Sequence, residues 1–195
     1  MVSFLVSVIL LTATPGPGVL SVAGVGAAFG APAGLRYLFG VFIGTNAVAL
    51  LAASGLAALM MAQPGLRLAL TILSVTYLGW LAFRIARQGD RLALTEHARP
   101  PGIRSGVTLQ VLNPKCHAVN LSLFSGFPLF DQVVGLEIAT KFLLINAVWI
   151  PVHIGWLSAG AGLAKLDISA GWRRALNLAM AATMLAAVLL ALFSG

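Results

Sequence analysis

The chain has 195 residues, of which 59% are hydrophobic and only 9% are charged, and its mean hydropathy is +0.99. Soluble domains carry roughly a quarter charged residues, so this composition excludes an ordinary water-soluble globular protein. The net charge of +7 does not indicate nucleic-acid binding, because the basic residues lie mostly between apolar runs and form no patch with interleaved aromatic residues. We therefore expect an all-α, polytopic membrane protein.

Apolar segments of about the length that a bilayer core requires predict six transmembrane helices. We place them at 2–27, 34–62, 66–87, 105–129, 135–163 and 171–193. The first lacks the basic n-region and the cleavage site of a secretory signal, so it is expected to be a retained span.

The spans form a single predicted transmembrane domain, 1–195, with two halves. Residues 1–87 and 105–195 hold three spans each, and a polar, Arg-rich cytoplasmic loop, 88–104, joins them. Because each half has an odd number of spans, the two halves enter the membrane in opposite orientations. This is the arrangement of inverted-repeat transporters.

The distribution of Lys and Arg predicts the orientation of the chain. Nine basic residues lie on one side of the membrane and two on the other. The nine are Arg36, Arg84, Arg87, Arg91, Arg99, Arg104, Lys165, Arg173 and Arg174, and the two are Arg67 and Lys141. Since cytoplasmic loops carry the excess of basic residues, both termini are predicted to lie outside, which is the periplasmic side in a Gram-negative cell.

The leading span of the first half is interrupted by the sequence Thr14, Pro15, Gly16, Pro17 and Gly18. Proline removes a backbone donor and glycine allows angles that other residues avoid. The backbone groups freed in this way must face protein, water or a ligand. This pattern predicts a substrate-binding break, and a kinked helix repaired by its neighbours is the alternative.

The leading span of the second half is interrupted at Asn113, Pro114 and Lys115. A lysine inside an apolar segment is costly and indicates a functional site. Lys115 would attract a substrate carboxylate, together with amides at the start of the following helix. The alternative is that its long side chain extends to the membrane interface. Paired interruptions in corresponding spans predict a binding site near the midplane.

Other polar residues lie inside the predicted spans. Those expected to add neutral hydrogen bonds to the substrate are Thr45, Asn46, Asn120 and Asn146, and those expected to relay protons are His117 and His153. Packing between helices is the alternative for the Asn and His residues. The tryptophans, Trp149 among them, are expected to include interfacial anchors rather than substrate contacts.

Enzyme chemistry is not expected. No pair of carboxylates lies within the spans, and the sequence has no metal-binding, nucleophile-elbow or phosphate-binding motif. Cys116 is the only cysteine, which excludes an internal disulfide or a two-cysteine thiol carrier. We expect no catalytic residues, no metal and no cofactor.

Three short motifs resemble the LysE/RhtB family of amino-acid exporters. They are Thr14-Pro15-Gly16-Pro17, Tyr77-Leu78-Gly79-Trp80 and Leu112-Asn113-Pro114-Lys115. Their order, the chain length and the six spans extend the resemblance over nearly the whole chain. It implies a bacterial inner-membrane protein driven by an ion gradient or by exchange. The chain departs from the family pattern at Gly18, where Asn is usual, and at Thr45, where Asp is usual.

The sequence thus predicts a secondary transporter that exports an amino acid or similar small metabolite by alternating access. The alternative is a non-transporting membrane subunit that binds another protein. The expected partners are the small-molecule substrate and the lipid bilayer, with a homodimer left open and no nucleic acid.

Overall fold

The computed structural model describes residues 1–87, 99–130 and 133–165 and, nearer the C-terminus, 171, 172, 175, 178, 179 and 182. Over these residues the chain is helical and contains no strand, which confirms the all-α class. The helices are α1 Val2–Ala13, α2 Pro17–Phe29, α3 Ala31–Ala53, α4 Leu56–Ala62, α5 Pro64–Arg87, α6 Ile103–Leu112, α7 Pro114–Ser125 and α8 Val134–Lys165.

Three of these helices, α3, α5 and α8, are long and apolar enough to cross a membrane. Helices α1 and α2 pass the same test together as a fourth candidate span, bent by 48° at the break between them. The predicted fourth span, 105–129, is divided into the shorter helices α6 and α7. Most of the predicted sixth span and of the loops at 88–104 and 165–174 lies outside the described residues.

The second predicted span was too long. It was placed at 34–62, but α3 ends at Ala53 and the short helix α4 follows. Gly55 has a φ of 77°, a left-handed conformation that glycine adopts readily and that ends a helix. The boundary is therefore set by the Ser54-Gly55 pair rather than by a polar loop.

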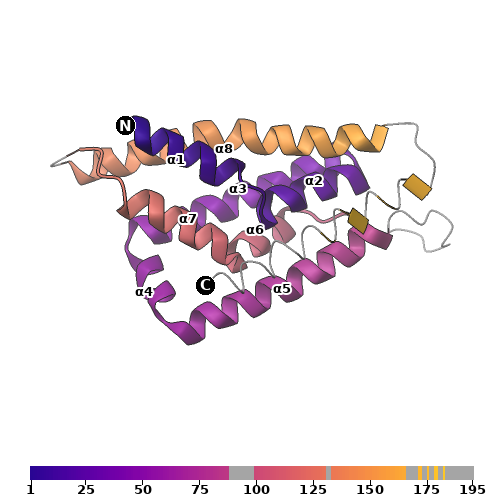
Figure 1. The fold of residues 1–195 in the computed structure, drawn as a ribbon, viewed down its shortest axis with the longest axis horizontal. Helices are drawn as coiled ribbons and strands as arrows, with labels where there is room; N and C mark the ends of the chain where they lie inside the picture. Colours follow the sequence, from indigo (N-terminus) through magenta and orange to yellow (C-terminus); the bar gives the residue numbers. More distant parts are fainter. Residues whose placement is uncertain are drawn as a thin grey trace.

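Figure 1 shows α1 and α2 lying along α8, with α6 and α7 between this layer and α5. Helix α3 packs most extensively on α6, and α2 packs most extensively on α8. Both crossings bring main chains close together at glycines. A Cβ atom on Gly40 would lie 2.1 Å from the carbonyl oxygen of Ile103, and one on Gly160 would lie 2.1 Å from that of Ala23. Glycine is thus required for these crossings.

We expect Gly160→Ala to lower the free energy of unfolding in detergent by about 1–3 kcal/mol, because the new methyl group meets the main chain of α2. Gly162→Ala is the matched control, since a Cβ there meets nothing within 4 Å. If both substitutions had the same effect, α2 and α8 would not cross at Gly160.

Many large apolar side chains remain exposed on the described helices. They include Leu10, Phe39, Leu50, Leu59, Leu73, Phe83, Leu143 and Ile150. A soluble monomer rarely exposes so much apolar surface. Together with the apolar helices, this surface fits a protein whose outer face contacts lipid.

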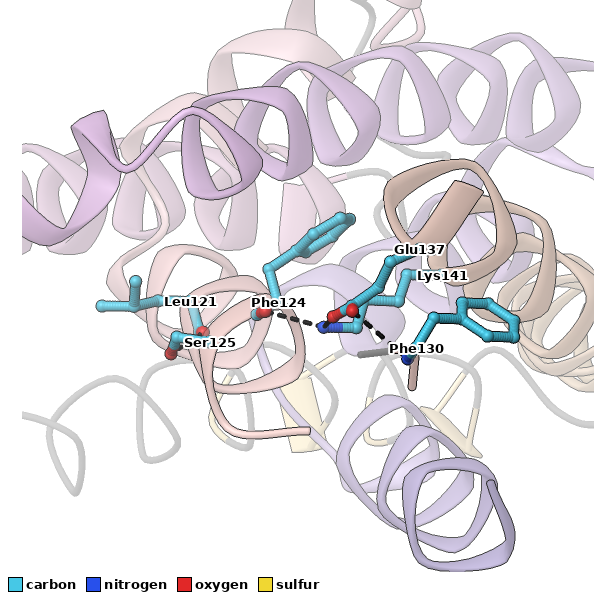
Figure 2. Close-up of polar contacts among 6 residues, drawn as sticks. All are labelled: Leu121, Phe124, Ser125, Phe130, Glu137 and Lys141. Carbon is cyan, nitrogen blue, oxygen red and sulfur yellow. Dashed lines mark hydrogen bonds and ion pairs between the residues drawn. The ribbon is translucent and has the colours of Figure 1, made fainter. Parts of the chain in front are cut away.

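At one end of the bundle an ion pair within α8 is hydrogen-bonded to the last turn of α7 (Figure 2). The ammonium of Lys141 lies 2.6 Å from the carboxylate of Glu137 and donates to the carbonyl oxygen of Phe124 at 2.8 Å. The side chain of Lys141 is buried, although the sequence placed this residue among the loop cations. Its position one helical turn after Glu137 lets it pair within α8 while it binds the last turn of α7.

Candidate functional site

The first break lies between α1 and α2. Helix α1 ends at Ala13, Gly16 is extended with φ −165° and ψ −179°, and Pro17 begins α2. Proline suits this first helical position because its missing N–H would have no partner there. No side chain caps the start of α2. The break thus places the carbonyl end of α1 next to the amide end of α2.

The second break lies between α6 and α7. Asn113 is extended, and its side-chain oxygen accepts a hydrogen bond from the backbone N–H of Lys115 at 3.1 Å. Pro114 occupies the first helical position, as Pro17 does in α2. Because Asn113 caps this helix, α7 offers fewer free amides than α2.

Lys115 connects the two breaks. Its ammonium donates to the carbonyl oxygen of Thr14 at 2.8 Å and to that of Pro15 at 3.4 Å. These carbonyls belong to the C-terminal end of α1, where the helix dipole favours a cation. Gly16 makes room for the contact, since a Cβ on it would lie 2.8 Å from the nitrogen of Lys115. The side chain of Lys115 is therefore directed to the other break.

A chain of neutral hydrogen bonds ties the second break to α3. The amide of Asn113 donates to Gln110 at 2.9 Å, and Gln110 donates to the hydroxyl of Thr45 at 2.6 Å. Thr45 in turn donates to the carbonyl oxygen of Val41. All three polar side chains are buried. Each donor in this chain has an acceptor, so the wall that it forms is polar but uncharged.

These elements surround a pocket with about 510 Å³ of empty space, part of it open to the exterior. The pocket is lined by apolar residues of α1, α2, α7 and α8 and by at least as many polar side chains. The predicted site residues in its lining are Thr14, Gly16, Gly18, Thr45, Asn113, Lys115, Asn120 and His153.

Six predicted residues do not line this pocket: Pro15, Pro17, Asn46, Pro114, His117 and Asn146. Asn46 and Asn146 hydrogen-bond each other, at 3.2 Å and 2.8 Å, and so connect α3 to α8. The Nε2 atom of His117 lies 2.8 Å from the carbonyl oxygen of Val111, while its Nδ1 atom is buried without a partner. Pro17 lies just beyond the break, in the first turn of α2. The contact between Asn46 and Asn146 is therefore one of packing between helices, the alternative given for them above.

We expect Asn46→Leu and Asn146→Leu each to lower the free energy of unfolding by about 1 kcal/mol, because each leaves one half-buried amide without its partner. The double variant should lose less than the sum of the two single losses. Additive losses in this double-mutant cycle, measured in detergent, would mean that the two amides do not interact.

The pocket also has lining residues that were not among the predicted site residues. Gln110, Cys116 and Trp149 all line it. Trp149 was expected among the interfacial anchors, but it is buried and its ring stacks on His153 at 3.7 Å. Gln110 could have been predicted, because it is a polar residue inside a predicted span.

An apolar helical bundle with two broken spans around a polar pocket defines a polytopic membrane protein of the transporter class. A model of the LysE type translocator family matches residues 9–195. The chain belongs to this family, and the resemblance of its three motifs is confirmed.

Two relatives illustrate the similarity. An uncharacterized membrane protein of Pseudomonas aeruginosa is 26% identical over 194 residues, which covers 93% of this chain and 86% of that protein. The leucine efflux protein of Klebsiella pneumoniae is 30% identical over 131 residues, which covers 64% of this chain and 61% of that protein. No solved structure matches the chain.

Proposed function

We propose that this chain is a secondary transporter that exports an amino acid or a similar small metabolite. The observation that carries the proposal is the pair of helix breaks held together by Lys115, which leaves main-chain groups and neutral side chains around one pocket. Membership of a translocator family supports it, as does the name of the leucine efflux protein.

The chemistry of the pocket favours a solute that carries a carboxylate and no cationic side chain. Lys115 is the charged residue in the described lining, and no Asp or Glu accompanies it. The uncapped start of α2, at Gly18 and Val19, offers amides for the carboxylate. Asn120 and Thr45 add neutral polar groups. A cationic side chain on the solute would find no acid among the described lining residues to pair with.

Two inverted halves, 1–87 and 105–195, would rock about this pocket to give alternating access. Two hydrogen bonds between the halves connect residues that lie 100 positions apart in the sequence. One joins Asn46 to Asn146, and the other joins Lys115 to Pro15. These contacts hold the two halves together at the pocket and beside it.

The orientation follows from the basic residues. We place the chain in a bacterial inner membrane with both termini on the periplasmic side, because the Arg-rich connection between the halves belongs in the cytoplasm. In this orientation the ion pair between Lys141 and Glu137 lies at the periplasmic end of the bundle.

A comparison of growth media tests the proposal. Cells that express the chain should release at least one neutral amino acid faster than cells with an empty vector, and should tolerate its toxic analogues better. Lysine and arginine should not accumulate, since no Asp or Glu lies among the described lining residues to pair with their side chains. An unchanged medium from cells that contain the folded protein would instead favour a non-transporting membrane subunit.

A further inference from the structure

Two lysines within the helices differ in their partners. Lys141 is paired with Glu137, so its charge is neutralised inside the bundle. Lys115 is partly buried, and its ammonium is held by the carbonyl oxygens of Thr14 and Pro15. Loss of a proton from Lys141 would break an ion pair, whereas loss from Lys115 would break hydrogen bonds to neutral groups. Buried lysines without an acid partner are the ones that give up a proton readily.

The ammonium of Lys115 lies at the position that the α-ammonium of a bound amino acid would take. Thr14, Gly18 and Val19 line the pocket, so the carbonyl end of α1 and the amide end of α2 both adjoin it. An α-amino acid carries an ammonium and a carboxylate on one carbon, so it would match these two adjoining ends. In the absence of substrate, the ammonium of Lys115 therefore binds the carbonyl oxygens that would otherwise bind the α-ammonium of the solute.

From this geometry we infer that Lys115 carries the proton that is exchanged for the exported amino acid. The inference rests on the proposed function. When the pocket faces the cytoplasm, the Lys115 ammonium releases one proton to water and leaves the carbonyls, and the α-ammonium of the solute takes its place. When the pocket faces outward, the solute leaves and the Lys115 amine takes one proton from the outer water. One proton enters for each amino acid that leaves.

Other titratable groups near Lys115 are few. Cys116 on α7 and His153 on α8 also line the pocket, while the lining residues of α1, α2, α3 and α6 carry no titratable side chain. The Nδ1 atom of His153 lies 2.9 Å from the carbonyl oxygen of Trp149, and its ring stacks on that tryptophan. Among the charged groups of α8, Glu137 is bound to Lys141. Lys115 is the group among these that touches both halves.

The test uses purified protein in lipid vesicles, with labelled leucine as the probe and labelled alanine and threonine as further probes. Counterflow, in which unlabelled solute inside drives uptake of label, measures exchange alone. Steady-state accumulation across a pH difference measures coupling. With one proton exchanged per solute, a difference of about one pH unit supports roughly a tenfold concentration ratio.

We expect the unmodified protein to show both activities. Lys115→Arg keeps the charge but cannot release it, so it should stay on the carbonyls and lose both counterflow and the tenfold ratio. Lys115→Gln is neutral, so it should keep a slower counterflow with a raised KM and lose the tenfold ratio. Lys141→Arg is the matched control and should keep the ratio.

The inference is overturned if either Lys115 variant still accumulates solute across the pH difference. It is also overturned if both variants lose counterflow, which would make Lys115 a binding residue alone, or if the unmodified protein exchanges solute without responding to pH. Absence of counterflow by the unmodified protein with every probe would instead refute the proposed function.

Discussion

Gly16→Val should reduce export on the order of tenfold or more while leaving the protein folded. A Cβ at this position would lie 2.8 Å from the nitrogen of Lys115 and 2.9 Å from its Cδ atom. The flexible end of the lysine has to move away, and it then loses the carbonyl oxygens of Thr14 and Pro15. Backbone strain is not the cause, since extended angles of −165° and −179° suit valine.

Gly102→Val provides a matched control. Gly102 also precedes the first residue of a helix, in an extended conformation with φ −114° and ψ −160°, but a Cβ there meets nothing within 4 Å. The rate of amino-acid release by whole cells, normalised to the amount of protein in the membrane, measures the effect. Equal rates for the two variants would show that contact between Lys115 and the first break is not needed for transport.

Gln110→Leu is expected to have the second large effect, on stability and transport together. The substitution removes the acceptor of the Asn113 amide, and a buried donor left in this way costs about 1–3 kcal/mol. It also removes the connection from Asn113 to Thr45, so the second break is no longer fixed to α3. Export should fall more than the loss of stability explains, because the pocket wall loses its position.

Thermal unfolding in detergent and export by cells measure the two effects. Gln63→Leu serves as the control, because Gln63 is exposed between α4 and α5 and should change stability by less than about 0.5 kcal/mol. Gln110→Leu with unchanged stability would contradict the hydrogen-bond chain that the structure shows.

Much of the framework could be predicted from local sequence. Apolar segments of membrane length predicted the helices, and the proline-containing motifs at Pro15 and Pro114 predicted where two of them break. Proline acts on its own backbone, so its effect is visible without tertiary structure. The end of α3 was missed because Gly55 lies in an apolar run, where a glycine is compatible with a helix or with its end.

The composition of the pocket depended on packing that the sequence does not display. Gln110 bonds to Thr45, 65 residues away, only because α3 crosses α6 at small residues. Asn46 and Asn146 are the same residue type as Asn120, yet the first two pair with each other and Asn120 lines the pocket. Each asparagine pairs or lines the pocket according to the helix face on which it lies. Polar residues scattered in apolar spans do not reveal which face turns inward.

Protection of Cys116 tests most directly whether a solute binds between the two breaks. This residue is the only cysteine of the chain and it lines the pocket, so its rate of alkylation by N-ethylmaleimide reports access to that space in the unmodified protein. We expect every amino acid that the protein exports to slow the alkylation, and lysine and arginine to leave it unchanged. An exported amino acid that leaves the rate unaffected at saturating concentration would contradict a binding site between the breaks.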